Sequence, residues 1–210
     1  MKKASFTLTF LISFGCITFS QNLTIGKQVW MTKNLDVSTF RNGDTIPQAK
    51  TDKEWEKAGE NEQPAWCYYD NNAKNGEKYG KLYNWYAVND PRGLAPKGWH
   101  VPSDKEWTVL TDYLGGEAVA GKKMKSSSGW KDYESKSGNG TNESGFLGLP
   151  SGYCYSNGLF YFIGSYCGWW STTEYSPSSA LIRELNYKVE GVGRYGNVKS
   201  LGFSVRCVRD

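Results

Sequence analysis

The residues of this chain with the most chemical potential are five cysteines and a single histidine. One histidine excludes every site that is built on more than one imidazole. His100 stands between Trp99 and Val101, a setting that favours a structural role over catalysis. The sequence contains no Cys-x-x-Cys, P-loop or Gly-x-Ser-x-Gly motif. We therefore predict no catalytic residue and no cofactor, and we do not expect an enzyme.

An oxygen-rich segment, DNNAKNGEKYG at residues 70–80, invites comparison with a calcium-binding loop. Such a loop needs Asp or Asn where Lys74 stands, and its glycine would come one residue earlier than it does here. Lys74, Lys78 and Lys81 would also repel a divalent cation. The segment therefore predicts an Asx-rich turn and no metal site.

The N-terminal segment, MKKASFTLTFLISFGCITFS at residues 1–20, has the pattern of a secretory signal peptide: two lysines, a short apolar run and small residues at its end. Cleavage after Ser20 would leave Gln21 as the first mature residue. Cys16 offers the alternative of a lipidated cysteine, although the residues before it fit a lipoprotein signal poorly. No later stretch approaches the roughly 20 apolar residues that span a bilayer. We expect an exported protein that is secreted, periplasmic or held at the cell surface.

Four cysteines remain once the signal segment is removed, and an even number in an exported chain favours two disulfides. Three connectivities are open, of which we favour Cys154 with Cys167 and Cys67 with Cys207. The first pair requires the chain to loop back after Ile163. The two outer strands of a tight three-stranded meander would lie about 10 Å apart, which is beyond the reach of a disulfide.

The composition indicates one domain of nearly balanced charge. Removal of Lys2 and Lys3 leaves 23 basic and 21 acidic residues, which argues against nucleic acid as a partner. About 190 residues are enough for one core, and no linker divides residues 21–210. The lysines at 122, 123 and 125 are interpreted as part of a solvated loop, and residues 126–144 as a long surface loop. The oligomeric state is left open.

Helix and strand signals are segregated along the chain. The segments that follow Thr51 and Ser103 each begin with a capping box, closed by a glutamate three residues later, and each ends at a glycine. A third helix is predicted within residues 80–90, and residues 23–37 are typical of a strand or hairpin. From Phe146 onward the chain is predicted to form strands and turns. Helices first and strands later, without βαβ alternation, indicate the α+β class.

Residues 152–175 are exceptionally rich in aromatic side chains. The pair Asn157 and Gly158 predicts a β-hairpin with a type I′ turn, because both central residues of that turn need a positive φ. Side chains alternate along a strand, so Phe160 and Phe162 are expected to share one face of the second strand.

Neighbouring residues of a strand point to opposite faces, so we expect only one of two adjacent tryptophans to face the core. We assign Trp169 to the core and Trp170 to the surface. Trp170, Tyr153, Tyr155 and Tyr166 are then the expected ligand-contacting residues, since exposed aromatic rings can stack on sugars or anchor a protein partner.

Seven segments in order resemble the Fibrobacter succinogenes major paralogous domain family, from about Thr24 to the C-terminus: IGKQVWMTKNL, NGDTIP, YGKLYNWYAV, APKGWHVPSDKEW, GLPSGY, WWSTTE and GFSVRCVRD. Two of these segments are also similar to the formylglycine-generating, sulfatase-modifying enzyme group, which belongs to the C-type-lectin-like fold superfamily. The resemblance implies an exported bacterial domain of C-type-lectin-like, formylglycine-generating-enzyme-like α+β fold. It implies no established activity.

Departures from these relatives limit what the resemblance implies. The catalytic cysteine pair of the formylglycine-generating enzymes has no counterpart, because residues 171–196 contain no cysteine. A lectin-type calcium motif is also absent, since the one Gln-Pro pair is early in the chain and is followed by Ala65. Family members often carry Arg at the position of Cys154 and usually no cysteine at that of Cys167, and these joint departures support pairing of the two.

The sequence therefore indicates an exported, non-catalytic binding domain that recognises a glycan or a surface protein at or outside the cell surface. The alternative is a divergent enzyme of the sulfatase-modifying group that lacks the catalytic cysteine pair.

Overall fold

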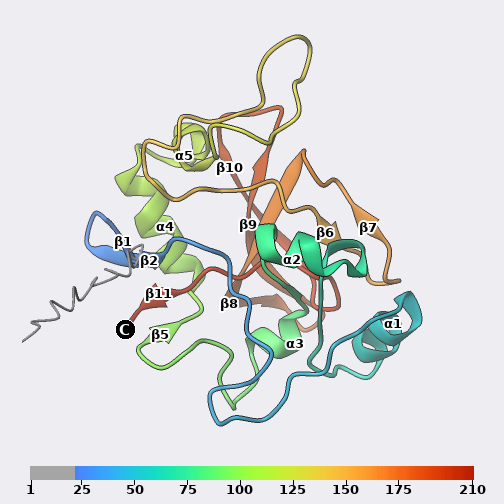
Figure 1. The fold of residues 1–210 in the computed structure, drawn as a ribbon. Helices are drawn as coiled ribbons and strands as arrows, with labels where there is room; N and C mark the ends of the chain where they lie inside the picture. Colours follow the sequence, from blue (N-terminus) through green and yellow to red (C-terminus); the bar gives the residue numbers. More distant parts are fainter. Residues whose placement is uncertain (1–21) are drawn as a thin grey trace, which may run out of the picture.

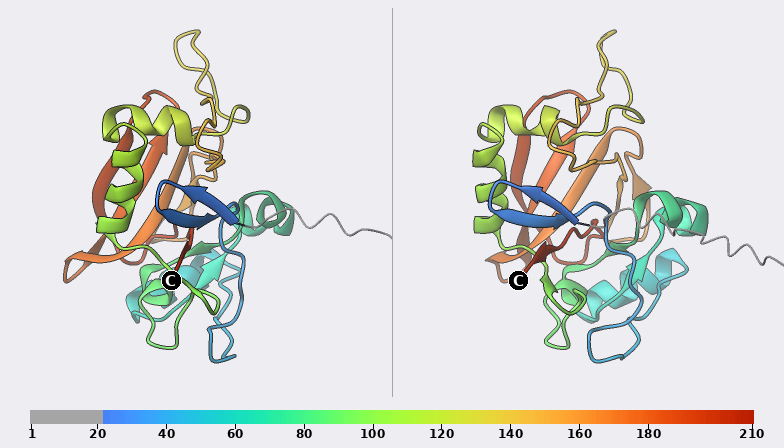
Figure 2. Two further views of the ribbon diagram at one scale, coloured as in Figure 1. Left: turned by 90° about the vertical axis from the view of Figure 1, so that its left-hand side faces the viewer. Right: turned by 60° about the vertical axis from the view of Figure 1, so that its left-hand side comes forward.

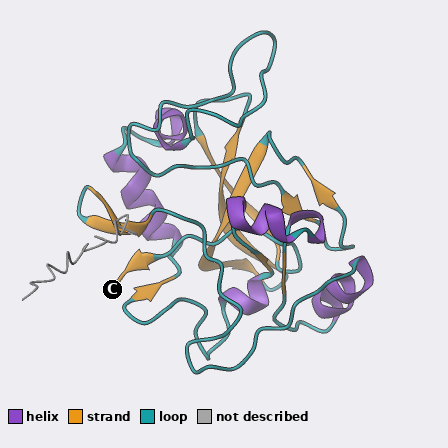
Figure 3. Cartoon of the chain, in the orientation of Figure 1, coloured by secondary structure: helices purple, strands orange, loops and turns teal. Residues whose placement is uncertain are grey.

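The computed structural model describes residues 22–210, so the expected signal segment and Cys16 lie outside the described residues. The described chain is an α+β structure with several antiparallel sheets and short helices (Figure 1). All of its helices occur before residue 125, and the chain beyond forms strands and loops. Figure 3 shows where the helices and strands lie in the structure. The α+β class and the predicted order of helices and strands are confirmed.

The two ends of the described chain meet in one small sheet. Strands β1 (Asn22–Ile25) and β2 (Gln28–Met31) form the predicted N-terminal hairpin, whose turn contains Gly26 at a φ of 60°. The last strand, β11 (Val208–Arg209), pairs with β2 on one side and with β5 (Trp99–His100) on the other. This sheet fastens the C-terminus to the first strands of the domain.

A three-stranded antiparallel sheet forms the centre of the domain. It contains β8 (Tyr166–Ser176), β9 (Ser179–Asn186) and β10 (Val192–Val198), with β9 in the middle. Trp169 and Trp170 are adjacent on β8, so their side chains point to opposite faces of this sheet. The two faces have different coverings.

Two helices cover one face of the central sheet, as Figure 2 shows. The first, α4 (Asp104–Tyr113), begins at Ser103 with the predicted capping box, in which Ser103 and Glu106 satisfy each other's backbone N–H groups. Its buried face presents Trp107 and Leu110 to the sheet, where Trp107 and Trp169 have ring centroids 6.1 Å apart.

The second helix, α5 (Glu117–Met124), was not predicted, because the lysines in it were read as part of a loop. Its start lacks a side-chain cap, since Gly116 occupies the N-cap position with a φ of 97°. Lys125 follows the helix and is buried, with Nζ donating to the carbonyl oxygens of Asn186 and Val189. The expectation of a solvated lysine cluster was therefore wrong for Lys125. Residues 126–144 form a loop, as expected.

The opposite face of the sheet packs on the segments that precede α4. Tyr83 and Trp85 lie in one core cluster with Trp170 of the sheet. The helix α1 (Asp52–Glu60), whose capping box between Thr51 and Glu54 is confirmed, belongs to a separate core cluster with the aromatic hairpin. Residues 80–90 form a short strand followed by one helical turn, so the predicted third helix is correct only in its second half. Residues 70–80 contain a helix instead of the expected turn, and Asn72 caps its start. The elements are α1 (Asp52–Glu60), β3 (Trp66–Cys67), η1 (Tyr69–Asn71), α2 (Ala73–Tyr79), β4 (Leu82–Tyr83) and α3 (Trp85–Val88).

The predicted aromatic hairpin is present as β6 (Tyr153–Cys154) and β7 (Phe160–Tyr161). Its turn is not type I′: Gly158 has a φ of 86°, whereas Asn157 has no positive φ, and Tyr155 N–H donates to the Leu159 carbonyl across a three-residue loop. The expected alternation also stops at Phe162.

Phe162 has a φ of 64°, an unusual value for an aromatic residue, and this backbone bend redirects its side chain. Its ring lies 5.9 Å from Tyr153 and 6.1 Å from Tyr161, whereas Phe160 contacts Tyr69. Phe160 and Phe162 therefore do not share a face. The backbone bend places the ring of Phe162 on the same side as the rings of Tyr153 and Tyr161.

The four described cysteines are all buried and free, so the two expected disulfides are not present. Cys154 and Cys167 belong to different core clusters, and so do Cys67 and Cys207. The chain does loop back after Ile163, but Cys154 and Cys167 pack on different sides of the structure. The thiol nearest to Cys67 is that of Cys154, with which it shares a core cluster. Cysteine count alone could not indicate this arrangement.

Candidate functional site: a tyrosine-lined cleft

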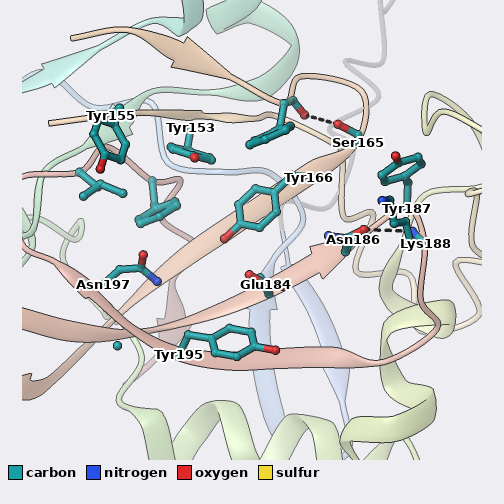
Figure 4. Close-up of a pocket in the computed structure, with 14 residues that line it drawn as sticks. Tyr153, Tyr155, Ser165, Tyr166, Glu184, Asn186, Tyr187, Lys188, Tyr195 and Asn197 are labelled. Carbon is teal, nitrogen blue, oxygen red and sulfur yellow. Dashed lines mark hydrogen bonds between the residues drawn. The ribbon is translucent and has the colours of Figure 1, made fainter. Parts of the chain in front are cut away.

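A cleft of about 600 Å³ opens where the aromatic hairpin meets the end of the central sheet. Its size is within the range typical of small-molecule sites. Its side chains come from the hairpin and the segment that follows it, the three strands of the sheet, the turn after β9, and the segment after β10. Figure 4 shows ten of these residues with labels. Seven of the lining residues are aromatic: Tyr153, Tyr155, Phe162, Tyr166, Tyr187, Tyr195 and Phe203.

The base of the cleft is a row of three residues across the central sheet. Glu184 on β9 pairs with Gly168 on β8 and with Gly193 on β10. Because neither partner has a side chain, neighbouring side chains pack over both glycines, and the ring of Phe203 lies over Gly168. A Cβ atom added at Gly193 would collide with Glu184 and with the ring of Tyr195. Both side chains therefore lie over the glycine backbone.

Tyrosines stand on both sides of this carboxylate. Tyr166 precedes Gly168 by two residues on β8, so both face the cleft, and its hydroxyl lies 3.3 Å from the position of a Cβ at Gly168. Tyr195 follows Gly193 by two residues on β10 and is 55% exposed. Figure 4 shows Glu184 on the middle strand between these two rings.

The wall formed by the hairpin is a set of packed rings. Tyr153 lies 5.5 Å from Tyr166 and 5.5 Å from Phe203, measured between ring centroids. Tyr155 and Phe162 extend this wall outward and are 43% and 58% exposed. These rings hold one another in place, so the cleft presents a preformed aromatic surface.

Glu184 carries the distinctive electrostatics of the cleft. Burial raises the pKa of its carboxyl group, and the hydrogen bond that it accepts from the Tyr166 hydroxyl opposes this rise. Burial beside Glu184 also raises the pKa of Tyr166. Within residues 22–210 the carboxylate forms no ion pair. It is a half-buried carboxyl group with the neutral Tyr166 hydroxyl beside it.

The cationic residue at the edge of the cleft, Lys188, lies over aromatic rings and forms no ion pair with Glu184. Lys188 lines the cleft, but its Nζ lies 4.7 Å above the ring of Tyr133 and 5.5 Å from that of Tyr187. The amide side chains of Asn186 and Asn197 supply neutral hydrogen-bonding groups beside the carboxylate. The cleft therefore combines ring faces, hydrogen-bonding groups and one negative charge.

Three of the four expected ligand-contacting residues lie together in this cleft: Tyr153, Tyr155 and Tyr166. The fourth, Trp170, does not. Its side chain is 0% exposed, and its indole N–H donates to the Tyr83 carbonyl at 2.8 Å. Trp169, expected in the core, is also 0% exposed. The assignment of Trp170 to the surface was wrong because the sheet is covered on both faces.

The sequence interpretation missed Glu184, Asn186 and Tyr195. A signal existed for the first two: alternation along the segment SALIRELN places Ile182, Glu184 and Asn186 on one face of a strand. No pattern in the sequence indicates that this strand lies between β8 and β10. The glycines that flank Glu184 become meaningful only when the strand register is known.

The fold and the cleft define the class of protein: an α+β domain whose central antiparallel sheet bears an aromatic cleft with one carboxylate at its base. The chain belongs to the Fibrobacter succinogenes major domain family, whose model matches residues 23–209. No curated protein and no solved structure matches the chain.

Two further observations concern residues 22–210. No helix in this part of the chain is long and apolar enough to cross a membrane. Within the same residues, His, Cys, Asp and Glu side chains do not gather in a group of three that could hold a metal ion.

Proposed function

We propose that this protein is an exported, non-catalytic binding domain that takes a glycan into the tyrosine-lined cleft. The observation that carries the proposal is the joint presence of ring faces and polar groups in one preformed cavity. Tyrosine and phenylalanine faces suit the apolar faces of sugar rings. Glu184, Asn186, Asn197 and the tyrosine hydroxyls suit the sugar hydroxyls.

The shape of the site favours a glycan over a protein partner. Protein recognition generally uses about 800 Å² of surface on each partner, with aromatic anchors at its centre. The aromatic residues here instead line a cleft of about 600 Å³ at one end of the sheet. A cavity of this kind accommodates a few sugar rings or a chain end.

A binding role is also consistent with the placement of reactive groups. Glu184 is the one acidic side chain among the residues that line the cleft. The four described thiols are buried in the core and do not line the cleft. Acid–base chemistry on a glycosidic bond commonly uses two carboxylates, which this cleft does not supply from residues 22–210.

We further propose that the domain has the C-type-lectin-like fold. The small sheet that joins β1 and β2 to β11 and the central antiparallel sheet with helices on one face support this assignment. Export, by a signal segment cleaved after Ser20, remains a prediction. Mass spectrometry of the mature protein would test it, since a lipid mass on Cys16 would contradict release by ordinary cleavage.

A glycan array probed with the full-length protein tests the proposed function. We expect a restricted set of oligosaccharides to bind, and binding to disappear when Tyr195 is replaced by alanine. Tyr113→Ala is the matched control, because Tyr113 is 65% exposed and lies on α4, outside the cleft. An array without any specific signal from the wild-type protein would contradict the proposal.

A further inference from the structure

The charge at the base of the cleft restricts the ligand. An ionised carboxylate that is partly buried without a cation is unfavourable, because it has lost water and gained no opposite charge. Glu184 is in this situation within residues 22–210: it is half-buried on β9, it forms no ion pair, and the Tyr166 hydroxyl lies beside it. A ligand that brings a positive charge would remove the penalty.

The surroundings of Glu184 are suited to a cation. The faces of aromatic rings attract positive charge within about 6 Å, and the effect grows as water is excluded. Tyr166 and Tyr195 flank the carboxylate, and Tyr153 packs against Tyr166. A carboxylate with aromatic side chains on both sides is a favourable site for an ammonium group.

The cleft itself leaves room for such a group, because Glu184 lines its open volume of about 600 Å³. The cross-strand neighbours of Glu184, Gly168 and Gly193, contribute no side chains, and the rings of Phe203 and Tyr195 lie over them. No protein cation occupies this space, since the Nζ atom of Lys188 lies over the rings of Tyr133 and Tyr187.

We propose that the cleft selects glycans that carry a free, protonated amino group, and that it seats this ammonium against Glu184 between Tyr166 and Tyr195. The inference rests on the proposed function, because it specifies the sugar class that the same cleft takes. It distinguishes amino sugars from their N-acetylated counterparts, which are similar in ring structure but lack the charge.

Isothermal titration calorimetry at pH 7 with the full-length protein tests the proposal. The probes are the β-1,4-linked disaccharide of glucosamine and the same disaccharide fully N-acetylated. We expect the free amine to bind at least tenfold more tightly to the wild-type protein. Equal affinity for the two disaccharides, or preference for the acetylated one, would overturn the proposal.

The variant Glu184→Gln removes the charge and keeps the size and a hydrogen-bond acceptor for Tyr166. We expect it to lose at least tenfold in affinity for the free amine and less than twofold for the acetylated disaccharide. Glu174→Gln is the control for net charge, because Glu174 lies on the same sheet, is exposed and is outside the cleft. Retention of amine affinity by Glu184→Gln would also overturn the proposal.

A third probe, tetramethylammonium, separates failure of this inference from failure of the proposed function. Equal binding of the free-amine and the N-acetylated disaccharides would support the glycan function and contradict the ammonium site. Binding of tetramethylammonium that depends on Glu184, with no binding of either disaccharide, would keep the cation site and contradict the glycan function. No binding of any probe would contradict both.

Discussion

Trp169 and Trp170 are neighbours on β8 that point to opposite faces of the central sheet, and both are completely buried. Trp169 packs against the α4 side and donates its indole N–H to Asn34 Oδ1 at 2.9 Å. Trp170 packs against Phe203 at 4.9 Å between ring centroids and donates to the Tyr83 carbonyl. The sheet is therefore a middle layer between two apolar cores.

This arrangement predicts that alanine at either tryptophan lowers the stability of the fold by a similar amount. Each substitution removes a fully buried ring and an indole hydrogen bond, so we expect Trp169→Ala and Trp170→Ala each to lower the free energy of unfolding by roughly 3 to 5 kcal/mol. Urea unfolding measures the change. Tyr175→Ala, at a position 67% exposed, is the control and should change stability little. Near-wild-type stability of either tryptophan variant would contradict the conclusion that both faces of the central sheet are covered.

A second prediction concerns the stability cost of Glu184. Burial raises the pKa of this carboxyl group above its ordinary value of 4.5, so the folded protein is penalised as pH rises through the raised pKa. Replacing Glu184 by Gln removes the penalty. We expect a Tm about 1 to 3 °C above wild type at pH 7, a small effect because the cleft is open to water.

The pH dependence provides the check on that second prediction. The gain in Tm should shrink as pH falls below the ordinary glutamate pKa, where the carboxyl group is protonated in both folded and unfolded states. A variant that is less stable than wild type at pH 7 would show that the charge contributes to the fold itself and is not held for a ligand.

The third prediction concerns His100, which bridges two carboxylates. Its Nε2 lies 2.7 Å from Glu106 and its Nδ1 lies 2.8 Å from Asp210. Partial burial disfavours the imidazolium, but the two carboxylates outweigh this and raise the pKa of His100 above 6.5. The stabilisation is therefore complete below about pH 6.5 and is lost as pH rises through the raised pKa.

Thermal unfolding of wild type and His100→Gln between pH 5.5 and 9 measures this effect. We expect the wild type to be the more stable protein at acid pH and its advantage to diminish as pH rises. The advantage is modest, since the side chain of His100 is 37% exposed and the pairs are screened by water. A difference in Tm that does not vary with pH would refute the imidazolium bridge.

The fourth prediction concerns the thiols. Burial raises the pKa of Cys67, raises that of Cys167 to about 11 and raises that of Cys207 to about 12. At pH 8 we expect negligible reaction of the native protein with a thiol reagent. Unfolding in denaturant without reductant should release four thiols from residues 22–210.

Ser178→Cys, at an exposed position, provides the positive control for the reagent. It should add one rapidly reacting thiol to the native protein. Detection of fewer than four thiols from residues 22–210 after unfolding without reductant would indicate disulfides and contradict the free thiols described above.

Much of the fold could be predicted because its signals are local. Capping boxes at Thr51 and Ser103 and the turn at Asn157 and Gly158 are encoded within a few residues. The errors arose where tertiary contacts decide the outcome. Phe162 takes a positive φ inside a run of aromatic residues, and α5 forms without a capping side chain because its buried face packs on the sheet.

The cleft was predictable in part for the same reason. Tyr153 and Tyr155 belong to the hairpin, and Tyr166 begins the strand that follows it, so all three are close in sequence. Glu184 and Tyr195 reach them only through the pairing of β8, β9 and β10, which no local pattern encodes. Trp170 was misplaced because alternation gives the direction of a side chain but not what covers it.

The most direct test of the glycan-binding cleft is the affinity of three proteins for the two disaccharides, measured by calorimetry. The proteins are the wild type, Tyr195→Ala and Tyr113→Ala, after thermal unfolding has shown that all three have the same Tm. The account predicts that wild type and Tyr113→Ala bind at least one disaccharide with the same affinity and that Tyr195→Ala loses at least tenfold. Wild-type affinity in Tyr195→Ala, or an equal loss in Tyr113→Ala, would contradict it.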